Sequence, residues 1–248
     1  MKRETVIEIQ DLHKSFGNLN VLKSISMNLY KGENLVVLGK SGTGKSVLIK
    51  CIVCLLEADG GSIRIMGEDI NTLNIKMLSE LRKKIGFLFQ GGALYDSMTV
   101  RQNLEFPLNR IKRGLAQQER TDIVCKVLEN VGLADVIDKM PSQLSGGMRK
   151  RISLARTLVS DPLIMLYDEP TTGLDPVTSD EISALINTVQ EKYKTSSIII
   201  THDIECARAT ADRLIMLEDG LVYMEGCLND FEQSKDAHIQ SFFKSITK

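Results

Sequence analysis

The chain has 248 residues, of which 43% are hydrophobic and 25% are charged, a composition typical of globular proteins. Such a chain can bury a packed core, which excludes disordered and collagen-like proteins. Its 31 Lys and Arg residues nearly balance 32 Asp and Glu residues, for a net charge of −1. This balance argues against a protein held on nucleic acid or on an anionic membrane by bulk charge.

The sequence predicts no segment that enters a membrane by itself. No apolar run approaches the roughly 18 residues that a membrane-spanning helix needs. Glu4 and Glu8 interrupt the N-terminal segment where a signal peptide would have its apolar centre. We therefore expect a cytoplasmic protein that associates with a membrane only through a partner.

Five cysteines, an odd number, indicate reduced thiols in a protein that is not secreted. Cys51 and Cys54 form a CxxC pair, but a zinc site would need a second pair at ligand spacing, and the sequence has none. A redox pair stays open beside the interpretation that both are small apolar residues on a buried helix face.

The first third of the chain predicts the order strand, glycine-rich loop and helix. Residues 5–12 alternate apolar and polar side chains, which is typical of a half-buried strand. After a turn at 31–33, residues 34–38 form a mostly apolar run that suits a strand covered on both faces. Glycines at 39–44 interrupt this run, and residues 45–57 have helical character.

The rest of the chain is mainly helical between about residues 76 and 158, and strands and helices alternate after it. The expected elements are strands at 85–89, 163–167 and 197–201, helices at 177–192 and 204–211, and a hairpin of 214–217 with 221–224 around Asp219-Gly220. We infer one domain, 1–248. Its parts are an α/β core (1–90 and 161–228), a helical subdomain (91–160) and a short amphipathic tail (229–248).

A phosphate-binding loop is the strongest motif of the chain. Gly39, Gly44, Lys45 and Ser46 hold the fixed positions of the P-loop pattern. Glycines let successive backbone N–H groups face one centre, and the following helix adds its positive N-terminal end. Lys45 can reach the β- and γ-phosphates, and the Ser46 hydroxyl can bind Mg²⁺. The expected nucleotide-binding residues of the loop are Gly39, Lys40, Ser41, Gly42, Thr43, Gly44, Lys45 and Ser46.

Two adjacent acids, Asp168 and Glu169, follow the apolar strand expected at 163–167. The carboxyl end of a buried parallel strand lies at the crevice where such sheets bind ligands. Asp168 can hold the Mg²⁺ shell, and Glu169 can polarise the attacking water as a general base. His202 follows another expected strand, so we expect it near the γ-phosphate as well.

A second motif, Leu144-Ser145-Gly146-Gly147-Met148, precedes these acids by about twenty residues. With the P-loop, in this order and spacing, it resembles the signature of the ATP-binding cassette (ABC) ATPases, and the resemblance covers about residues 6–226. It implies an α/β P-loop NTPase fold with a mainly parallel core sheet, an N-terminal antiparallel β part and an inserted helical subdomain. It also implies ATP and Mg²⁺ as cofactors, and ATP hydrolysis coupled to transport across a membrane.

The resemblance also implies roles for single residues. Phe16 matches the aromatic residue that stacks on adenine, and Gln90 matches the Q-loop glutamine that links Mg²⁺ and water to the transmembrane partner. Asp175 matches the D-loop aspartate, and His202 the switch histidine. The expected catalytic set is Glu169, His202, Gln90 and Lys45, and the expected Mg²⁺ ligands are Ser46, Gln90 and Asp168.

Ser145, Gly146 and Gly147 are expected to begin a helix and so to form another anion site. In ABC ATPases this site caps the γ-phosphate bound to the P-loop of the other subunit. Since one cassette has one P-loop and one signature, a two-fold dimer closes two composite sites, and we expect a homodimer. An ordinary helix N-cap is the simpler interpretation of the same residues, and both can hold.

The subfamily features resemble most the MlaF type, the ATPases of Mce-type lipid transporters. They lie in segments 44–48, 89–100 and 144–151, where Val47 and Met148 replace the Thr and Gln of many importer ATPases. This resemblance implies phospholipid transport between envelope membranes. The implied partners are integral-membrane permease subunits, an Mce substrate-binding protein and a small regulatory protein, on the inner face of the cytoplasmic membrane. Cys54 and residues 58–61 depart from the family pattern, outside the catalytic set.

Other functions stay open. An ABC ATPase for import of amino acids or ions is the alternative within the transporter class. A soluble ABC protein acting on DNA or ribosomes would need a long coiled coil or a second cassette, and the roughly 100 residues between Gly44 and Ser145 contain no heptads. The signature motif that precedes Asp168 argues against a P-loop kinase of small molecules. The charge runs 82–84 and 149–151 are expected to be solvated helix faces or contacts to nucleotide and partner subunits rather than a nucleic-acid patch.

Overall fold

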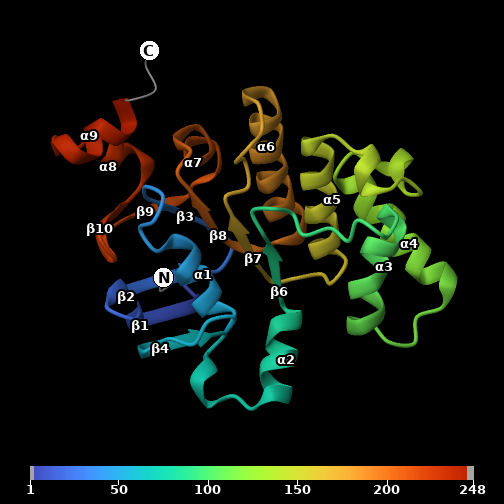
Figure 1. Ribbon diagram of the computed structural model, residues 1–248, viewed down its shortest axis with the longest axis horizontal. Helices are drawn as coiled ribbons and strands as arrows, with labels where there is room; N and C mark the ends of the chain where they lie inside the picture. The colour runs from blue at the N-terminus through green and yellow to red at the C-terminus, as the bar shows by residue number, and fades with distance from the viewer. Residues whose placement is uncertain (1–2, 245–248) are drawn as a thin grey trace. The chain divides into compact units, whose positions relative to one another are not determined.

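The computed structural model describes residues 3–244 and divides the chain into two compact units (Figure 1). The first unit consists of the residues up to Leu73 together with those from Ser196 onward, and the second runs from Asn74 to Thr195. The helical insertion expected at 91–160 lies within the second unit, and its status as a subdomain stays a prediction.

An antiparallel sheet begins the first unit. Its strands lie in the order β2 (Leu19–Tyr30), β1 (Thr5–Phe16), β4 (Gly60–Ile65) and β5 (Glu68–Asp69). β1 continues beyond the alternating segment 5–12, because its register shifts after Ile9 and Asp11 takes a positive φ of 46°. Such a bulge interrupts the alternation that marks a strand in sequence. The expected N-terminal antiparallel part is confirmed.

A second group of strands in this unit is mainly parallel. β3 (Asn34–Leu38) is buried along its whole length and runs parallel to both β8 (Ser196–Thr201) and β9 (Arg213–Glu218). β9 and β10 form the hairpin expected around Asp219-Gly220. The strands lie in the order β10 (Leu221–Gly226), β9 (Arg213–Glu218), β3 (Asn34–Leu38) and β8 (Ser196–Thr201).

The first helix of this unit ends at Ile52, although helical character was expected to residue 57. Cys54 has a left-handed φ of 54°, which a right-handed helix cannot contain. Burial raises the pKa of the Cys51 thiol to about 11, so the thiol stays protonated at neutral pH. This favours the apolar interpretation of the CxxC pair. The helices of the unit are α1 (Lys45–Ile52), the 3₁₀ turn η1 (Ile70–Thr72), α7 (Ile204–Thr210), α8 (Leu228–Glu232) and α9 (Ala237–Lys244).

The second unit combines two parallel strands with helices. β6 (Ile85–Leu88) pairs with β7 (Ile164–Asp168). The three helices α3 (Val100–Ile111), α4 (Gln117–Asn130) and α5 (Gly146–Leu158) pack on one another (Figure 1). Its helices are α2 (Ile75–Lys83), α3 (Val100–Ile111), α4 (Gln117–Asn130), η2 (Ala134–Val136), η3 (Pro141–Gln143), α5 (Gly146–Leu158) and α6 (Pro176–Tyr193). Within residues 3–244, no helix has both the length and the apolar character needed to cross a bilayer.

A largely buried ion pair fixes the start of β9 to the turn between β2 and β3. Arg213 donates hydrogen bonds to the Glu33 carboxylate and, at 2.6 Å, to the carbonyl oxygen of Asn28. The same carboxylate accepts a hydrogen bond from the backbone N–H of Tyr30 at 2.8 Å. Removal of the guanidinium would leave the buried Glu33 carboxylate without its main counter-charge.

Arg213→Met should lower the free energy of unfolding by about 3–5 kcal/mol, because one partner of a buried pair is lost. Arg208→Met is the control, since Arg208 pairs at the surface with Glu205 and Glu232, where such pairs contribute about 1 kcal/mol or less. Urea unfolding of the purified chain measures both variants. Equal losses in the two would contradict the greater weight given to the buried pair.

Candidate active site

The P-loop of the first unit connects the end of β3 to the start of α1. Gly42 and Gly44 have φ values of 86° and 97°, in the region that glycine enters without strain. A Cβ on Gly44 would come within 2.9 Å of the Leu22 side chain and 3.0 Å of the Val21 carbonyl oxygen. The loop can therefore take this path only with glycine at position 44.

Lys45 directs its positive charge into this loop. The Lys45 side chain is buried, and its Nζ donates hydrogen bonds to the carbonyl oxygens of Gly39 at 2.6 Å and Lys40 at 2.9 Å. No side chain caps the N-terminus of α1, where Gly44 is the N-cap residue and Ser46 lies in the first turn. An ammonium group, glycine backbone and an uncapped helix N-terminus fit a phosphate group.

Phe16 and His202 lie in the same unit as the P-loop. Phe16 pairs with Leu19 at the end of the β1–β2 hairpin, and the residue is 47% exposed. It is close in sequence to Val21 and Leu22, which leave no room for a Cβ at Gly44. His202 is exposed and directly follows Thr201, which is the register partner of Leu38. The structure thus brings His202 and Gly39 to the same end of two paired strands.

Asp168 and Glu169 lie at the end of β7 in the second unit, where both are buried. Glu169 is a non-glycine residue with a left-handed φ of 51°. The Thr172 hydroxyl donates a hydrogen bond to Glu169 Oε2 at 3.1 Å. Gln90 follows β6, whose Leu88 is the register partner of Tyr167 in β7, so Gln90 and the two acids lie at one strand edge.

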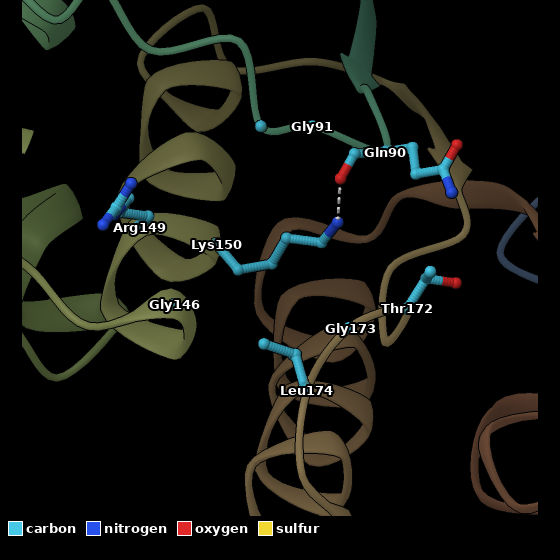
Figure 2. Close-up of a pocket in the computed structure, with 9 residues that line it drawn as sticks. Gln90, Gly91, Gly146, Arg149, Lys150, Thr172, Gly173 and Leu174 are labelled. Carbon is cyan, nitrogen blue, oxygen red and sulfur yellow. Dashed lines mark hydrogen bonds between the residues drawn. The ribbon is translucent and has the colours of Figure 1, made fainter.

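A cavity of about 330 Å³ opens beside this edge, and Figure 2 shows how its side chains lie. Lys150 extends across it toward Gln90, whereas Arg149 points away on the other side of the helix. The cavity therefore brings the Q-loop, the signature helix and the segment after Glu169 together. It is lined by Gln90, Gly91, Gly92, Gly146, Arg149, Lys150, Thr172, Gly173 and Leu174.

The signature residues begin α5, and the helix-cap interpretation is confirmed. Ser145 is the N-cap residue, and its Oγ accepts a hydrogen bond from the Met148 N–H at 3.2 Å. A Cβ on Gly147 would lie 2.5 Å from Cγ2 of Thr178, so glycine is needed for the close approach of α5 to α6. A role of Ser145, Gly146 and Gly147 toward phosphate stays a prediction.

Asp175 is the N-cap residue of α6. Its carboxylate accepts hydrogen bonds from the Thr178 N–H at 3.0 Å and the Thr178 hydroxyl at 2.6 Å. The hydrogen bonds from the Thr178 side chain and backbone lower the pKa of Asp175. Thr178 therefore contacts both the aspartate expected in the D-loop and the signature glycine.

The charge run 149–151 differs from the expected solvated helix face. Lys150 is only 6% exposed, and its Nζ donates hydrogen bonds to the carbonyl oxygens of Gln90 at 2.7 Å and Glu169 at 3.3 Å. Burial lowers the pKa of Lys150, and the nearby Asp168 and Glu169 carboxylates oppose that shift. Helical spacing offered a signal for this, since Lys150 is three and four residues before the buried Ser153 and Leu154.

The expected site residues thus fall into two groups, one in each unit. The first unit holds Phe16, residues 39–46 and His202, and the second holds Gln90, residues 145–147, Asp168, Glu169 and Asp175. The expected Mg²⁺ ligands are a hydroxyl, an amide and a carboxylate, the oxygen donors that this hard cation prefers. Within the described part of the chain, no three His, Cys, Asp or Glu side chains gather as an alternative metal site.

Comparisons with known proteins identify the family. The model of the family described as ABC transporter matches residues 22–172. The methionine import ATP-binding protein MetN of Brucella abortus is 38% identical over 89% of this chain and 59% of its own length. The probable ribonucleotide transport ATP-binding protein mkl of Mycobacterium leprae is 42% identical over 88% of this chain and 62% of its own length.

The chain thus spans about three-fifths of the length of these two curated relatives. Among solved structures, the dimer of MJ0796, a bacterial ABC transporter cassette, matches with a TM-score of 0.82 and 34% identity over 90% of this chain and 98% of that chain. The chain belongs to the ABC transporter family and has its P-loop ABC ATPase fold.

Proposed function

We propose that this chain is the ATP-binding and ATP-hydrolysing subunit of a membrane transporter. The observation that carries the proposal is the geometry of the P-loop, in which a buried lysine and an uncapped helix N-terminus meet at glycines with positive φ values. The family match and the signature at the start of α5 support ATP as the nucleotide.

In this proposal the first unit binds the nucleotide, with Phe16 against adenine and residues 39–46 around the phosphates. Mg²⁺, when bound by Ser46, Gln90 and Asp168, would neutralise charge on the phosphate oxygens. Glu169 would accept the proton of the attacking water, and Thr172 fixes one of its carboxylate oxygens. His202 would contact the γ-phosphate from the end of β8.

We propose a homodimer in which residues 145–147 of each subunit complete the nucleotide site of the other. The dimeric state of the MJ0796 cassette supports this arrangement. Ser145 caps α5 through its Oγ, and this contact fixes the helix N-terminus that would face the phosphate. ATP binding would close such a dimer, and hydrolysis would let it reopen.

The permease is proposed to bind at a groove after the Q-loop. A cavity of about 470 Å³ in the second unit is lined by aromatic side chains that include Phe87, Phe89, Tyr95 and Phe106. The Arg156 guanidinium donates to the Ala93 carbonyl oxygen at 2.6 Å and so fixes one wall of this groove. An apolar groove of this kind suits a short apolar helix presented by a membrane protein.

The cargo is proposed to be an amino acid, in line with the alternative of an ABC ATPase for import of amino acids or ions. The names of the two relatives refer to methionine import and to ribonucleotide transport, and they support this alternative better than the phospholipid expected from Val47 and Met148. An Mce protein and a small regulatory protein as partners remain parts of the phospholipid alternative.

Glu169→Gln should lower the turnover of ATP by about 100-fold or more while ATP binding is kept, because only the proton acceptor is removed. Lys45→Ala should instead weaken ATP binding by about 10- to 100-fold, as expected for the loss of a charge-assisted hydrogen bond. Phosphate release and nucleotide titration measure the two effects. Near-normal hydrolysis by Glu169→Gln would remove the proposed base.

Tyr95→Glu should reduce capture of the permease, because it places a charge in the apolar groove. Tyr95 is 44% exposed, so the substitution leaves the core intact. Leu221→Glu is the matched control, because Leu221 is also 44% exposed but lies in the first unit. Co-purification of tagged variants from detergent extracts measures the effect, and equal recovery of permease with both variants would contradict this docking site.

The cargo can be tested on the complex purified with its permease. Molecules that co-purify are identified by mass spectrometry, and ATP hydrolysis is then measured with added amino acids or with phospholipid vesicles. Stimulation by an amino acid is the expected result. Stimulation by phospholipid alone would replace the importer alternative with lipid transport.

A further inference from the structure

Lys150 occupies an unusual position for a lysine, because its ammonium group is buried and faces the backbone. It extends from the second turn of α5, and both hydrogen bonds that it donates end on carbonyl oxygens, of Gln90 at 2.7 Å and of Glu169 at 3.3 Å (Figure 2). Burying an ammonium group costs free energy, and proteins tolerate it where hydrogen bonds from its N–H groups offset that cost. Gln90 lies two residues after the end of β6, and Glu169 directly follows Asp168, the last residue of β7.

The backbone of Glu169 needs such support. Its φ of 51° is left-handed, and a residue with a long side chain stays in this region only where its surroundings hold it. Lys150 holds its carbonyl oxygen, and the Thr172 N–H approaches the same oxygen at 3.4 Å. The Thr172 hydroxyl holds the carboxylate at 3.1 Å, so both ends of Glu169 are fixed.

The same ammonium group also fixes Gln90 relative to Glu169. Gln90 has an exposed side chain that points away from Lys150 in Figure 2, and its backbone carbonyl is the group that Lys150 holds. α5 begins at the signature glycines, four residues before Lys150. One side chain therefore connects the signature helix with the two segments that carry the proposed water-binding residues.

We propose that Lys150 is a positioning residue for ATP hydrolysis, which holds the backbone of Glu169 and Gln90 in the geometry that directs the Glu169 carboxylate toward the attacking water. This inference rests on the proposed function of Glu169. Lys150 touches no reacting atom in this scheme, and it acts through the carbonyl groups of two other residues. Small displacements of a base can lower a rate by about 100-fold, so the effect is measurable in kcat.

Lys150→Met keeps the aliphatic stem and removes the donors. We expect kcat to fall about 10- to 100-fold, while KM for ATP changes less than about twofold. Lys150→Ala is the second variant without the donors. Lys150 lines an open cavity, so in this variant water can reach the two freed carbonyl groups and form hydrogen bonds with them. We therefore expect the variant to fold. Lys150→Arg retains a cationic donor and should restore kcat to within about fivefold.

Arg151→Met is the matched control on the same helix. Arg151 pairs with Glu181 and contacts neither Gln90 nor Glu169, so its removal should change kcat less than about twofold. Thermal melting of each variant separates loss of fold from loss of turnover. An unchanged kcat in folded Lys150→Met or Lys150→Ala, or an equal loss in Arg151→Met, would overturn the inference.

A double variant shows whether Lys150 acts through Glu169. Added to Glu169→Gln, Lys150→Met should lower the residual turnover less than about twofold, since the carboxylate that it positions is gone. A further fall in turnover as large as that of Lys150→Met alone would show that Lys150 does not act through Glu169, and it would contradict the inference. Failure of the proposed function is distinct, because Glu169→Gln alone would then hydrolyse ATP at a near-normal rate.

Discussion

The carboxyl ends of paired, buried strands are the constraint on which both groups of functional residues depend. In the first unit, the register of Leu38 with Thr201 places Gly39 and His202 side by side. In the second, the register of Leu88 with Tyr167 does the same for Gln90 and the acids after β7. A slip of one residue would turn each of these side chains to the other face of its strand. β3, β7 and β8 are buried along their whole length, so such a slip would also displace packed side chains on both faces of each strand.

Much of this arrangement could be predicted from the sequence, because motif and strand lie next to each other in the chain. The P-loop, the two acids and His202 each follow an apolar run, and the elements from β7 to β10 agree with the expected ranges within two residues. The extent of β1 could not be predicted, because a bulge at Asp11 interrupts the alternation of apolar and polar residues that marks a strand. The end of α1 could not either, since it depends on one left-handed residue, Cys54.

Lys150 shows a different limit of the sequence. A run of three basic residues looks like a solvated helix face, and only one of the three is buried. The contacts that hold it are with carbonyl groups 60 and 19 residues away, and any residue type could supply those groups. Helical spacing can indicate that Lys150 is buried, but it does not indicate which backbone groups the side chain meets, so its role becomes visible only in three dimensions.

The contacts of Lys45 have a consequence for ligand choice. Its ammonium group donates to two carbonyl oxygens of its own loop, so these internal contacts contribute to the shape of the loop. An incoming anion therefore competes with internal acceptors, and its affinity reflects the difference between the two sets of contacts. A singly charged ion offers little advantage over two well-placed carbonyl groups, whereas a polyphosphate offers several charges along the loop. The internal contacts of Lys45 would therefore favour a polyphosphate over small singly charged anions in this loop.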